Sequence, residues 1–348
     1  MTINEKYIAR CIELAKKGSG NVSPNPMVGC VIVHNQKIVG EGFHEKYGEA
    51  HAEVNAINAV KNQELLKKST LYVSLEPCAH HGLTPPCADL IIKKQIPKVV
   101  IGAVDPFMKV AGKGIEKMKN AGIEVEVGTL EKECRELNKR FFTFFEKQRP
   151  FVILKWAQTQ DRFIDIDRKS NKYGEPTWIT GHKALVKVHE MRAAEDAILV
   201  GTHTAEKDNP SLTVRHCPGK NPVRIVLDRQ LRLPKTLKLF DNSTDTLVFN
   251  SLKTKTEKNT HFIKIDFSEN SIQQVLTELK NCNIQSLIVE GGQQLLTSFI
   301  RKGLWDEAHI YTGNKFFQSG VSAPKIYGTL LYEEKIDNDL LHVFINPR

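Results

Sequence analysis

The residues best suited to chemistry lie between positions 51 and 87. His51 is followed two residues later by Glu53, and Cys78 and Cys87 each follow a proline. One imidazole and two thiolates would give a zinc ion three protein ligands. Structural zinc sites usually take four protein ligands, whereas a three-ligand site leaves the fourth position for water. The spacing therefore predicts a catalytic zinc centre held by His51, Cys78 and Cys87.

Glu53 would be the acid–base group of this centre and not a ligand. Zinc lowers the pKa of its bound water to about 7, which makes hydroxide available at neutral pH. An adjacent free carboxylate can take that proton and deliver it to a departing amine. The combination of histidine, glutamate and two Pro-Cys pairs is typical of zinc-dependent deaminases.

Helix geometry limits how these residues can meet. Residues two apart on a regular helix do not share a face, so we expect His51 at the very start of its helix. Proline is well tolerated in the first helical turn. We therefore expect Cys78 and Cys87 at helix N-termini, where the helix dipole favours the thiolate.

A structural zinc site is the main alternative at this point. His80 and His81 lie beside Cys78, and either could be a fourth ligand. Taken alone, a His-x-Glu pair is more often an ordinary exposed pair, and a cysteine is more often a buried small hydrophobe. The joint occurrence of all four residues in this order favours catalysis.

The first half of the chain, which contains these residues, reads as an alternating series of strands and helices. The apolar spacing of Ile8, Cys11, Ile12 and Ala15 predicts an opening helix that ends near Gly18. Further helices are expected at 51–62, 86–95, 112–121 and 131–145. Strands are expected at 28–33, 37–43, 70–75, 98–104 and 123–127, the first two as a hairpin.

A domain boundary is predicted near Gln148–Pro150, because proline disfavours helix in the residue before it. A second α/β series follows. Its strands are expected at 151–156, 197–200, 223–227, 246–249, 262–265, 286–289, 308–311 and 341–345. Its helices are expected at 183–192, 272–281 and 293–302.

Length and composition agree with two globular domains. The chain has 348 residues, 41% of them hydrophobic and 26% charged. The N-terminus lacks the apolar core of a signal peptide, and no apolar run approaches the ~20 residues that cross a bilayer. We therefore expect a cytoplasmic protein without a membrane partner. Its seven cysteines then favour metal binding or burial over disulfides.

Motifs on both sides of the boundary resemble one family, the bifunctional deaminase–reductase of riboflavin biosynthesis. The distance from Cys78 to Cys87 is longer than the usual Cys-x-x-Cys of nucleoside and nucleic-acid deaminases. The similar stretches of the first half are Asn25–Gly29, Gly42–His44, Glu76–Asp89 and Val110–Gly114. Those of the second half are Leu154–Ala157, Thr177–Thr180, Asp208–Arg215, Pro222–Asp228 and Glu290–Gly292.

The resemblance implies an α/β protein with a cytidine-deaminase-like αβα domain at 1–148 and a dihydrofolate-reductase-like α/β domain at 149–348. The first domain would use zinc-activated hydroxide to deaminate 2,5-diamino-6-ribosylamino-4(3H)-pyrimidinone 5′-phosphate. The second would use NADPH to reduce the ribosyl group, which yields 5-amino-6-ribitylamino-uracil 5′-phosphate. The binding partner would be a small phosphorylated pyrimidine and not a nucleic acid. The resemblance is compatible with a homo-oligomer.

The family's functional positions transfer onto this sequence residue by residue. His51, Cys78 and Cys87 would bind zinc, and Glu53 would move protons. The pyrimidine or its phosphate would contact Asn25, His44 and Asp105. Positions that match cofactor-binding residues are Ala157, Trp178, Thr204, Asp208, Gly292, Gln293, Gln294, Leu295, Leu296, Thr297 and Ser298. Positions that match substrate-binding residues of the reductase are Arg192, Leu212, Arg215 and Glu290.

Some of these residues also suit their roles chemically. Gly291-Gly292 before a helix can admit a phosphate to the helix N-terminus, and Arg192 and Arg215 can bind a phosphate in bidentate fashion. Three positions depart from the family pattern. Phe107 stands where asparagine is usual, Pro176 where serine is frequent, and Arg162 where glycine is frequent.

Two rival functions follow from the same residues. A nucleic-acid deaminase would flip a base into the zinc site and use the net charge of +9 for phosphates. The long spacing between the cysteines and the second α/β series argue against it. A structural zinc module fused to a nucleotide-binding regulator would have no use for the free carboxylate of Glu53.

Overall fold

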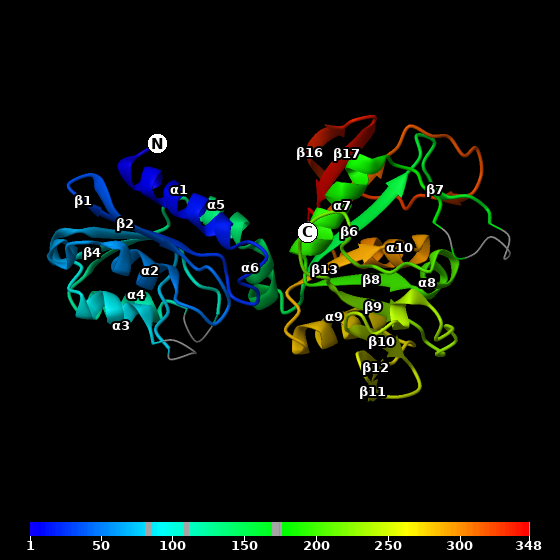
Figure 1. The fold of residues 1–348 in the computed structure, drawn as a ribbon, viewed down its shortest axis with the longest axis horizontal. Helices are drawn as coiled ribbons and strands as arrows, with labels where there is room; N and C mark the ends of the chain where they lie inside the picture. Colours follow the sequence, from blue (N-terminus) through cyan, green and yellow to red (C-terminus); the bar gives the residue numbers. More distant parts are fainter. Residues whose placement is uncertain (81–84, 108–110, 169–173, 175, 348) are drawn as a thin grey trace. The chain divides into compact units, whose positions relative to one another are not determined.

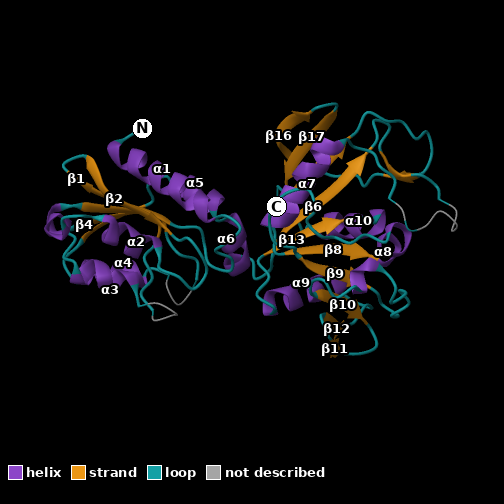
Figure 2. Ribbon diagram, in the orientation of Figure 1, coloured by secondary structure: helices purple, strands orange, loops and turns teal. Residues whose placement is uncertain are grey.

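The computed structural model describes residues 1–80, 85–107, 111–168, 174 and 176–347. The chain divides into two compact units, Met1–Gln148 and Arg149–Arg348. Figure 1 shows the two units, and Figure 2 shows that each combines helices with a sheet. None of the helices in the described ranges is long and apolar enough to cross a membrane.

The first unit is built on a sheet with the strand order β2-β1-β3-β4-β5. Its described strands are β1 (Gly29–His34), β2 (Lys37–Phe43), β3 (Thr70–Leu75), β4 (Lys98–Ala103) and β5 (Glu124–Val127). The hairpin β1–β2 and the pair β1–β3 are antiparallel, whereas β3, β4 and β5 run parallel.

Helices cover both faces of this sheet (Figure 1). They are α1 (Ile3–Ala15), α2 (Ala52–Ala59), α3 (Cys87–Lys93), α4 (Lys113–Asn120), α5 (Glu131–Leu137) and α6 (Lys139–Glu146). Successive side chains of a strand point to opposite faces. Accordingly, Val31 and Val33 of β1 pack with α1, α5 and α6, while Cys30 and Ile32 pack with α2, α3 and α4.

Two helices of the first unit differ from the sequence expectation. The helix expected at 51–62 ends at Ala59, and a 3-10 helix follows at Gln63–Lys68. The helix expected at 131–145 is two helices, because Asn138 interrupts it with φ −112° and ψ 27°. The Asn138 side chain is hydrogen-bonded to the backbone N–H and C=O of Met27, at 2.8 Å each. That tertiary contact replaces the helical conformation at this residue.

The second unit contains a ten-stranded sheet in the order β11-β12-β10-β9-β8-β13-β6-β14-β17-β16. Its strands among the described residues are β6 (Phe151–Gln158), β8 (Ala197–Gly201), β9 (Val223–Leu227), β10 (Thr246–Asn250), β11 (Lys255–Glu257), β12 (Thr260–Lys264), β13 (Ser286–Glu290), β14 (Glu307–Thr312), β16 (Thr329–Ile336) and β17 (Asp339–Ile345). The run from β12 to β14 is parallel, and β11, β17 and β16 pair antiparallel at the edges. A separate pair joins β7 (Phe163–Asp165) to β15 (Val321–Ser322).

The helices of this unit are α7 (His182–Ala194), α8 (Thr202–Asp208), α9 (Ser271–Asn281) and α10 (Gln293–Lys302). Leu276 and Leu279 of α9 and Leu296 and Phe299 of α10 pack on one side of the parallel strands. Ala205 of α8 belongs to a second cluster with Ile198 and Val226.

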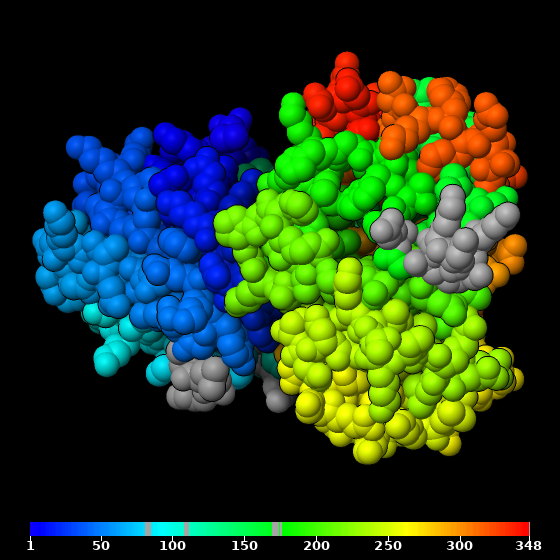
Figure 3. Space-filling model, turned by 45° about the vertical axis from the view of Figure 1, so that its right-hand side comes forward, coloured from blue at the N-terminus to red at the C-terminus, as the bar shows by residue number. Residues whose placement is uncertain are grey.

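The outermost strand, β16, was not expected from the sequence. Its residues Leu330, Leu331 and Tyr332 are 48%, 50% and 43% exposed. β16 forms a hairpin with β17, and Figure 3 shows this hairpin, in red, on the surface of the second unit. An exposed strand lacks the apolar alternation that predicts a half-buried one.

Candidate active sites

The three predicted zinc ligands meet at one point of the first unit. The ligand atoms of His51, Cys78 and Cys87 all lie within 4.8 Å of one another. His51 Nδ1 is 3.6 Å from Cys78 Sγ and 3.4 Å from Cys87 Sγ. His51 is the N-cap of α2, as its spacing from Glu53 required, and Cys87 is the first residue of α3.

Cys78 does not begin a helix, so that expectation is wrong. It lies in the loop after β3, where its sulfur accepts the Cys87 backbone N–H at 3.3 Å and its carbonyl accepts the Ala88 N–H at 3.1 Å. Hydrogen bonding with the Cys87 thiol, followed by that with His51, lowers the pKa of Cys78 to about 4. These contacts favour the thiolate of Cys78, which is the metal-binding form. The pKa of Cys87 is raised instead, by its hydrogen bond with Cys78 and by burial.

Glu53 lies in the first turn of α2 and is 3% exposed. Burial raises its pKa to about 7, although the neighbouring His51 opposes the increase. It does not belong to the three-residue ligand cluster, but its carboxyl group is hydrogen-bonded to Cys87. A buried carboxyl beside the ligands and outside their set is the arrangement expected of a proton carrier.

The fourth-ligand alternative gains no support from the described residues, where the ligand cluster does not include His80. The Nδ1 atom of His80 is buried without a hydrogen-bond partner in that part of the chain, and its ring contacts Phe107 at 5.9 Å. His81 lies outside the described residues.

Asn25 and His44 lie together beside this centre. The Asn25 amide N–H donates to His44 Nε2 at 3.1 Å, and His44 Nδ1–H donates to the Ala50 carbonyl at 3.1 Å. Since a carbonyl can only accept, the ring must carry its proton on Nδ1. The His44 ring contacts the His51 ring at 5.4 Å. The structure therefore brings two predicted substrate residues to the zinc ligands.

Asp105 follows β4 and is 8% exposed. Its Oδ1 accepts the Phe107 N–H at 2.8 Å, and burial raises its pKa to about 7. The Phe107 ring contacts Phe145 at 5.0 Å. Phe107 stands where the family usually has asparagine, and in this chain it makes an aromatic contact instead.

Glu76 is a residue whose importance the sequence analysis missed. Its buried carboxylate accepts four backbone N–H groups, those of Asp105, Gly112, Gly114 and Ile115, at 2.9–3.3 Å. It thereby ties the loop of Asp105 to the N-terminus of α4. A Cβ on Gly114 would lie 2.2 Å from the Pro77 carbonyl oxygen, so this close approach requires glycine. The Glu-Pro-Cys motif includes Glu76, but the motif does not indicate which N–H groups its carboxylate binds.

In the second unit, the predicted cofactor residues of α8 and of the segment Gly292–Ser298 lie beyond the carboxyl ends of the parallel strands β8 and β13. Gly291 and Gly292 join β13 to α10 with φ of +95° and +82°. A Cβ on either glycine would stand 3.2–3.4 Å from atoms of Thr204 on α8. The side chains of Leu295 and Leu296 are buried in the core, and Ser298 Oγ donates to the Gln294 carbonyl at 2.8 Å.

Asp208, the last residue of α8, forms an ion pair with Arg168. Arg168 also donates to Asp165 at 2.7 Å, and Asp165 accepts the Thr177 hydroxyl at 2.7 Å. Trp178 is 55% exposed. Ala157 lies on β6, paired in register with Tyr311 of β14. Thr204 thus lies beside the glycine pair and Asp208 pairs with Arg168. Within the described residues, no hydrogen bond or ion pair joins Trp178 or Ala157 to either group.

Arg192 and Glu290 form a bidentate pair, with N–O distances of 3.0 and 2.7 Å. Burial opposes ionisation, but the charges of Arg192 and Lys155 lower the pKa of Glu290 to about 2. Lys155 lies 3.8 Å from Glu290, and burial lowers its own pKa. The sequence motif contained Lys155, but the sequence analysis gave it no role.

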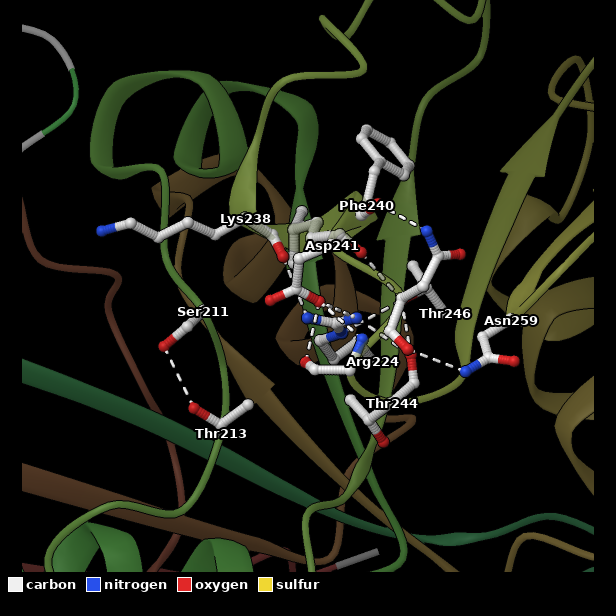
Figure 4. Close-up of polar contacts among 12 residues, drawn as sticks. Ser211, Thr213, Arg224, Lys238, Phe240, Asp241, Thr244, Thr246 and Asn259 are labelled. Atoms are coloured by element: carbon white, nitrogen blue, oxygen red, sulfur yellow. Dashed lines mark hydrogen bonds and ion pairs between the residues drawn. The ribbon is translucent and has the colours of Figure 1, made fainter.

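The remaining substrate positions, Leu212 and Arg215, lie on the loop after α8. Leu212 is buried with φ +53°. The Arg215 guanidinium donates to Ser211 Oγ and, at 3.1 Å, to Thr213 Oγ1. Figure 4 shows the contact between Ser211 and Thr213.

Figure 4 also shows the buried Arg224 that anchors a neighbouring segment. It is fully buried and donates to Thr246 Oγ1 at 3.0 Å and to the carbonyls of Lys238 and Thr244 at 3.0 and 2.9 Å. It also pairs with Asp241 at 2.9 Å. These partners are structural, and they leave Arg224 no role in the site.

The departures at 162 and 176 lie near β7. Arg162 has φ +64°, and its N–H donates to the Thr159 carbonyl at 3.0 Å. A left-handed residue in a tight turn explains why glycine is frequent at this position. Pro176 is exposed.

Comparisons with known proteins agree with this geometry. Residues 1–103 match the cytidine and deoxycytidylate deaminase zinc-binding region, and residues 150–326 match the RibD C-terminal domain. The riboflavin biosynthesis protein RibD of Aquifex aeolicus is 41% identical over 92% of this chain and 89% of its own length. The chain belongs to the RibD family.

Solved RibD structures share the whole fold. The Thermotoga maritima diaminohydroxyphosphoribosylaminopyrimidine deaminase/5-amino-6-(5-phosphoribosylamino)uracil reductase is 38% identical with a TM-score of 0.87, over 99% of both chains. RibD of Acinetobacter baumannii is 34% identical with a TM-score of 0.89, also over 99% of both. This RibD protein thus has a cytidine-deaminase-like N-terminal domain and a dihydrofolate-reductase-like C-terminal domain.

Family membership also establishes the general activity. This RibD protein is a bifunctional deaminase and reductase of riboflavin biosynthesis, with zinc and NADPH as its cofactors.

Proposed function

We propose that the unit 1–148 deaminates 2,5-diamino-6-ribosylamino-4(3H)-pyrimidinone 5′-phosphate. The unit 149–348 then reduces the resulting 5-amino-6-(5-phosphoribosylamino)uracil to 5-amino-6-ribitylamino-uracil 5′-phosphate. The observation that carries the proposal is the convergence of His51, Cys78 and Cys87 beside the buried carboxyl of Glu53.

The donor set of the first unit fits zinc. An imidazole and two cysteines in this cluster suit a three-ligand site, and the Cys87 N–H at the start of α3 favours the thiolate of Cys78. Zinc held by His51, Cys78 and Cys87 would supply the Lewis acidity that activates water. Glu53 takes a proton at its carboxylate oxygen and returns it to the departing amine.

The pyrimidine or its phosphate would contact Asn25, His44 and Asp105. His44 is held in the Nδ1–H form by Ala50, so its Nε2 is a fixed acceptor that orients the Asn25 amide. Because His44 and Asp105 are buried, water would be excluded from the polar groups that contact the pyrimidine ring of the substrate.

In the second unit, a dinucleotide phosphate would bind at Gly291-Gly292, at the start of α10. A Cβ at either glycine would fill the space next to Thr204, and the N-terminus of α10 provides free backbone N–H groups. NADPH supplies a hydride when it is bound. We assign its binding to Ala157, Trp178, Thr204, Asp208 and the segment Gly292–Ser298, of which Leu295 and Leu296 contribute backbone only because their side chains are core.

The reductase substrate would meet Arg192, Leu212, Arg215 and Glu290. Arg215 is exposed and carries the guanidinium that suits a phosphate. The Arg192 guanidinium already binds the Glu290 carboxylate. We therefore assign to Arg192 the role of keeping Glu290 ionised and positioned beside the ribosyl group of the substrate.

These assignments describe an enzyme of small phosphorylated metabolites, and we place it in the cytoplasm. The test is to incubate the purified, zinc-loaded chain with the diamino pyrimidine phosphate, with and without NADPH. Mass spectrometry should show an amino group replaced by oxygen without NADPH, and the further gain of two hydrogens with it. Recovery of unchanged substrate in both reactions would refute the proposal.

A further inference from the structure

His189 lies in α7, one turn before Arg192, and is fully buried. Its Nδ1 is 3.0 Å from the backbone nitrogen of Arg215, which donates its N–H to the ring. A backbone N–H can only donate, so Nδ1 must be unprotonated. A neutral ring then carries its proton on Nε2, an atom that is buried and lacks a partner among the described residues.

The surroundings of His189 oppose a charged ring. Burial acts first, followed by the positive charges of Arg192 and Arg215 and by His216, whose ring lies 4.6 Å away. The nearby carboxylate of Glu290 acts in the other direction, but it is already paired with Arg192. Burial and the neighbouring positive charges outweigh Glu290, and the pKa of His189 is lowered to about 4.

The loop that receives this hydrogen bond needs support. Leu212 has the left-handed φ of +53°, a backbone conformation that is unfavourable for a residue with a Cβ. Three contacts hold the segment that follows. Arg192 donates to the Thr213 carbonyl at 3.3 Å, Asn221 Oδ1 accepts the Val214 N–H at 2.8 Å, and His189 accepts the Arg215 N–H.

We propose that His189 is a positioning residue of the reductase: as the neutral Nε2–H imidazole it fixes the backbone of Arg215, so that this guanidinium is in place for the substrate's phosphate. The inference rests on the proposed function, because Arg215 receives its role there. Protonation of Nδ1 would set two donors against each other and add a third positive charge between Arg192 and Arg215.

The kinetic test uses the full-length protein with NADPH and 5-amino-6-(5-phosphoribosylamino)uracil. His189→Phe keeps a ring but removes the acceptor, and KM for the uracil should rise about tenfold while kcat changes less than about twofold. His189→Asn places an amide oxygen near the position of Nδ1, and KM should stay within about twofold of the wild-type value. Equal KM values in all three proteins, or equal impairment of both variants, would overturn the proposal.

The tautomer can be checked in the wild-type protein, with His189→Asn used only to assign the signal. In ¹⁵N-histidine-labelled wild type, the His189 signal, assigned by its absence from His189→Asn, should show an unprotonated Nδ1 and a protonated Nε2. It should not titrate between pH values of about 5.5 and 8. A protonated Nδ1 in that range would overturn the inference even if His189→Phe failed to fold.

Arg215→Ala separates this inference from the proposed function. If Arg215→Ala leaves KM unchanged, the phosphate assignment of the proposed function fails, and the role of His189 fails with it. If Arg215→Ala raises KM but folded His189→Phe does not, only the inference about His189 is wrong.

Discussion

His51 and Glu53 lie two residues apart at the start of α2, and this placement gives them different tasks. His51 is the N-cap, outside the helical turn, and its ring reaches Cys78 and Cys87. Glu53 is already helical and lies beside Cys87 without joining the ligand set. Two residues of spacing thus suffice to place a ligand and a proton carrier at one centre.

Cys87→Ser should remove most of the zinc from the purified protein. The buried Sγ of Cys87 is one of three ligand atoms, and a hydroxyl is a poor replacement for a thiolate on zinc. Metal analysis by mass spectrometry measures the loss. Cys282→Ser is the matched control, because Cys282 is exposed and lies in the other unit. Full zinc content in folded Cys87→Ser would contradict the ligand assignment.

Glu53→Gln should keep its zinc and lose deamination. The amide retains the size of the side chain but cannot take up a proton, and general acid–base catalysis contributes about 10²–10⁴-fold in rate. Ammonia release, measured beside zinc content, checks the prediction. A deamination rate near the wild-type value would mean that another group carries the proton.

At the scale of elements, regular apolar spacing predicted most of the fold. Strands with buried faces, such as β3 and β9, occur at the expected residues because their side chains are apolar and β-branched. Tertiary contacts produced two of the exceptions. Asn138 breaks a helix to bind Met27, and Cys78 stays in a loop to meet the head of α3.

Other features depend on contacts between residues distant in sequence, which one sequence does not reveal. Glu76 binds N–H groups up to 39 residues away, and no local pattern identifies those partners. Of the site, the zinc ligands and Glu53 could be predicted because their chemistry restricts residue type and spacing. The reductase residues required the family resemblance, since an isolated Arg192 or Glu290 is not distinctive.

Glu76→Gln should weaken the first unit and its deaminase activity. The carboxylate accepts four N–H groups, whereas an amide has one accepting oxygen, and each lost bond to a charged group costs about 1–3 kcal/mol. We expect a lower melting temperature and a kcat/KM for deamination reduced by about tenfold or more. Glu116→Gln, an exposed change in the same first turn of α4, should alter neither. Identical behaviour of the two variants would refute the role of Glu76.

At the scale of the whole molecule, the second unit should lose stability in acid. The pKa of folded His189 is about 4, below its ordinary value of 6.5. Between these values the unfolded chain binds a proton that the folded unit does not, so stability falls as pH decreases from about 7 to about 4, by up to about 3 kcal/mol.

Tryptophan fluorescence can follow this unfolding, since Trp156, Trp178 and Trp305 all lie in the second unit. Denaturant titrations at several pH values should show a shallower loss of stability for His189→Asn than for the wild type. The carboxylates titrate in both proteins and cancel in the comparison. Parallel curves would show that His189 is not the group responsible.

We propose that the two reactions are carried out by separate sites in separate units. The most direct test is product analysis of Asp208→Ala with the diamino pyrimidine phosphate and NADPH. Asp208 ends α8 in the second unit, while every proposed deaminase residue lies before Gln148. We expect ammonia release at the wild-type rate and accumulation of the deaminated, unreduced product. Loss of ammonia release from correctly folded Asp208→Ala would contradict it.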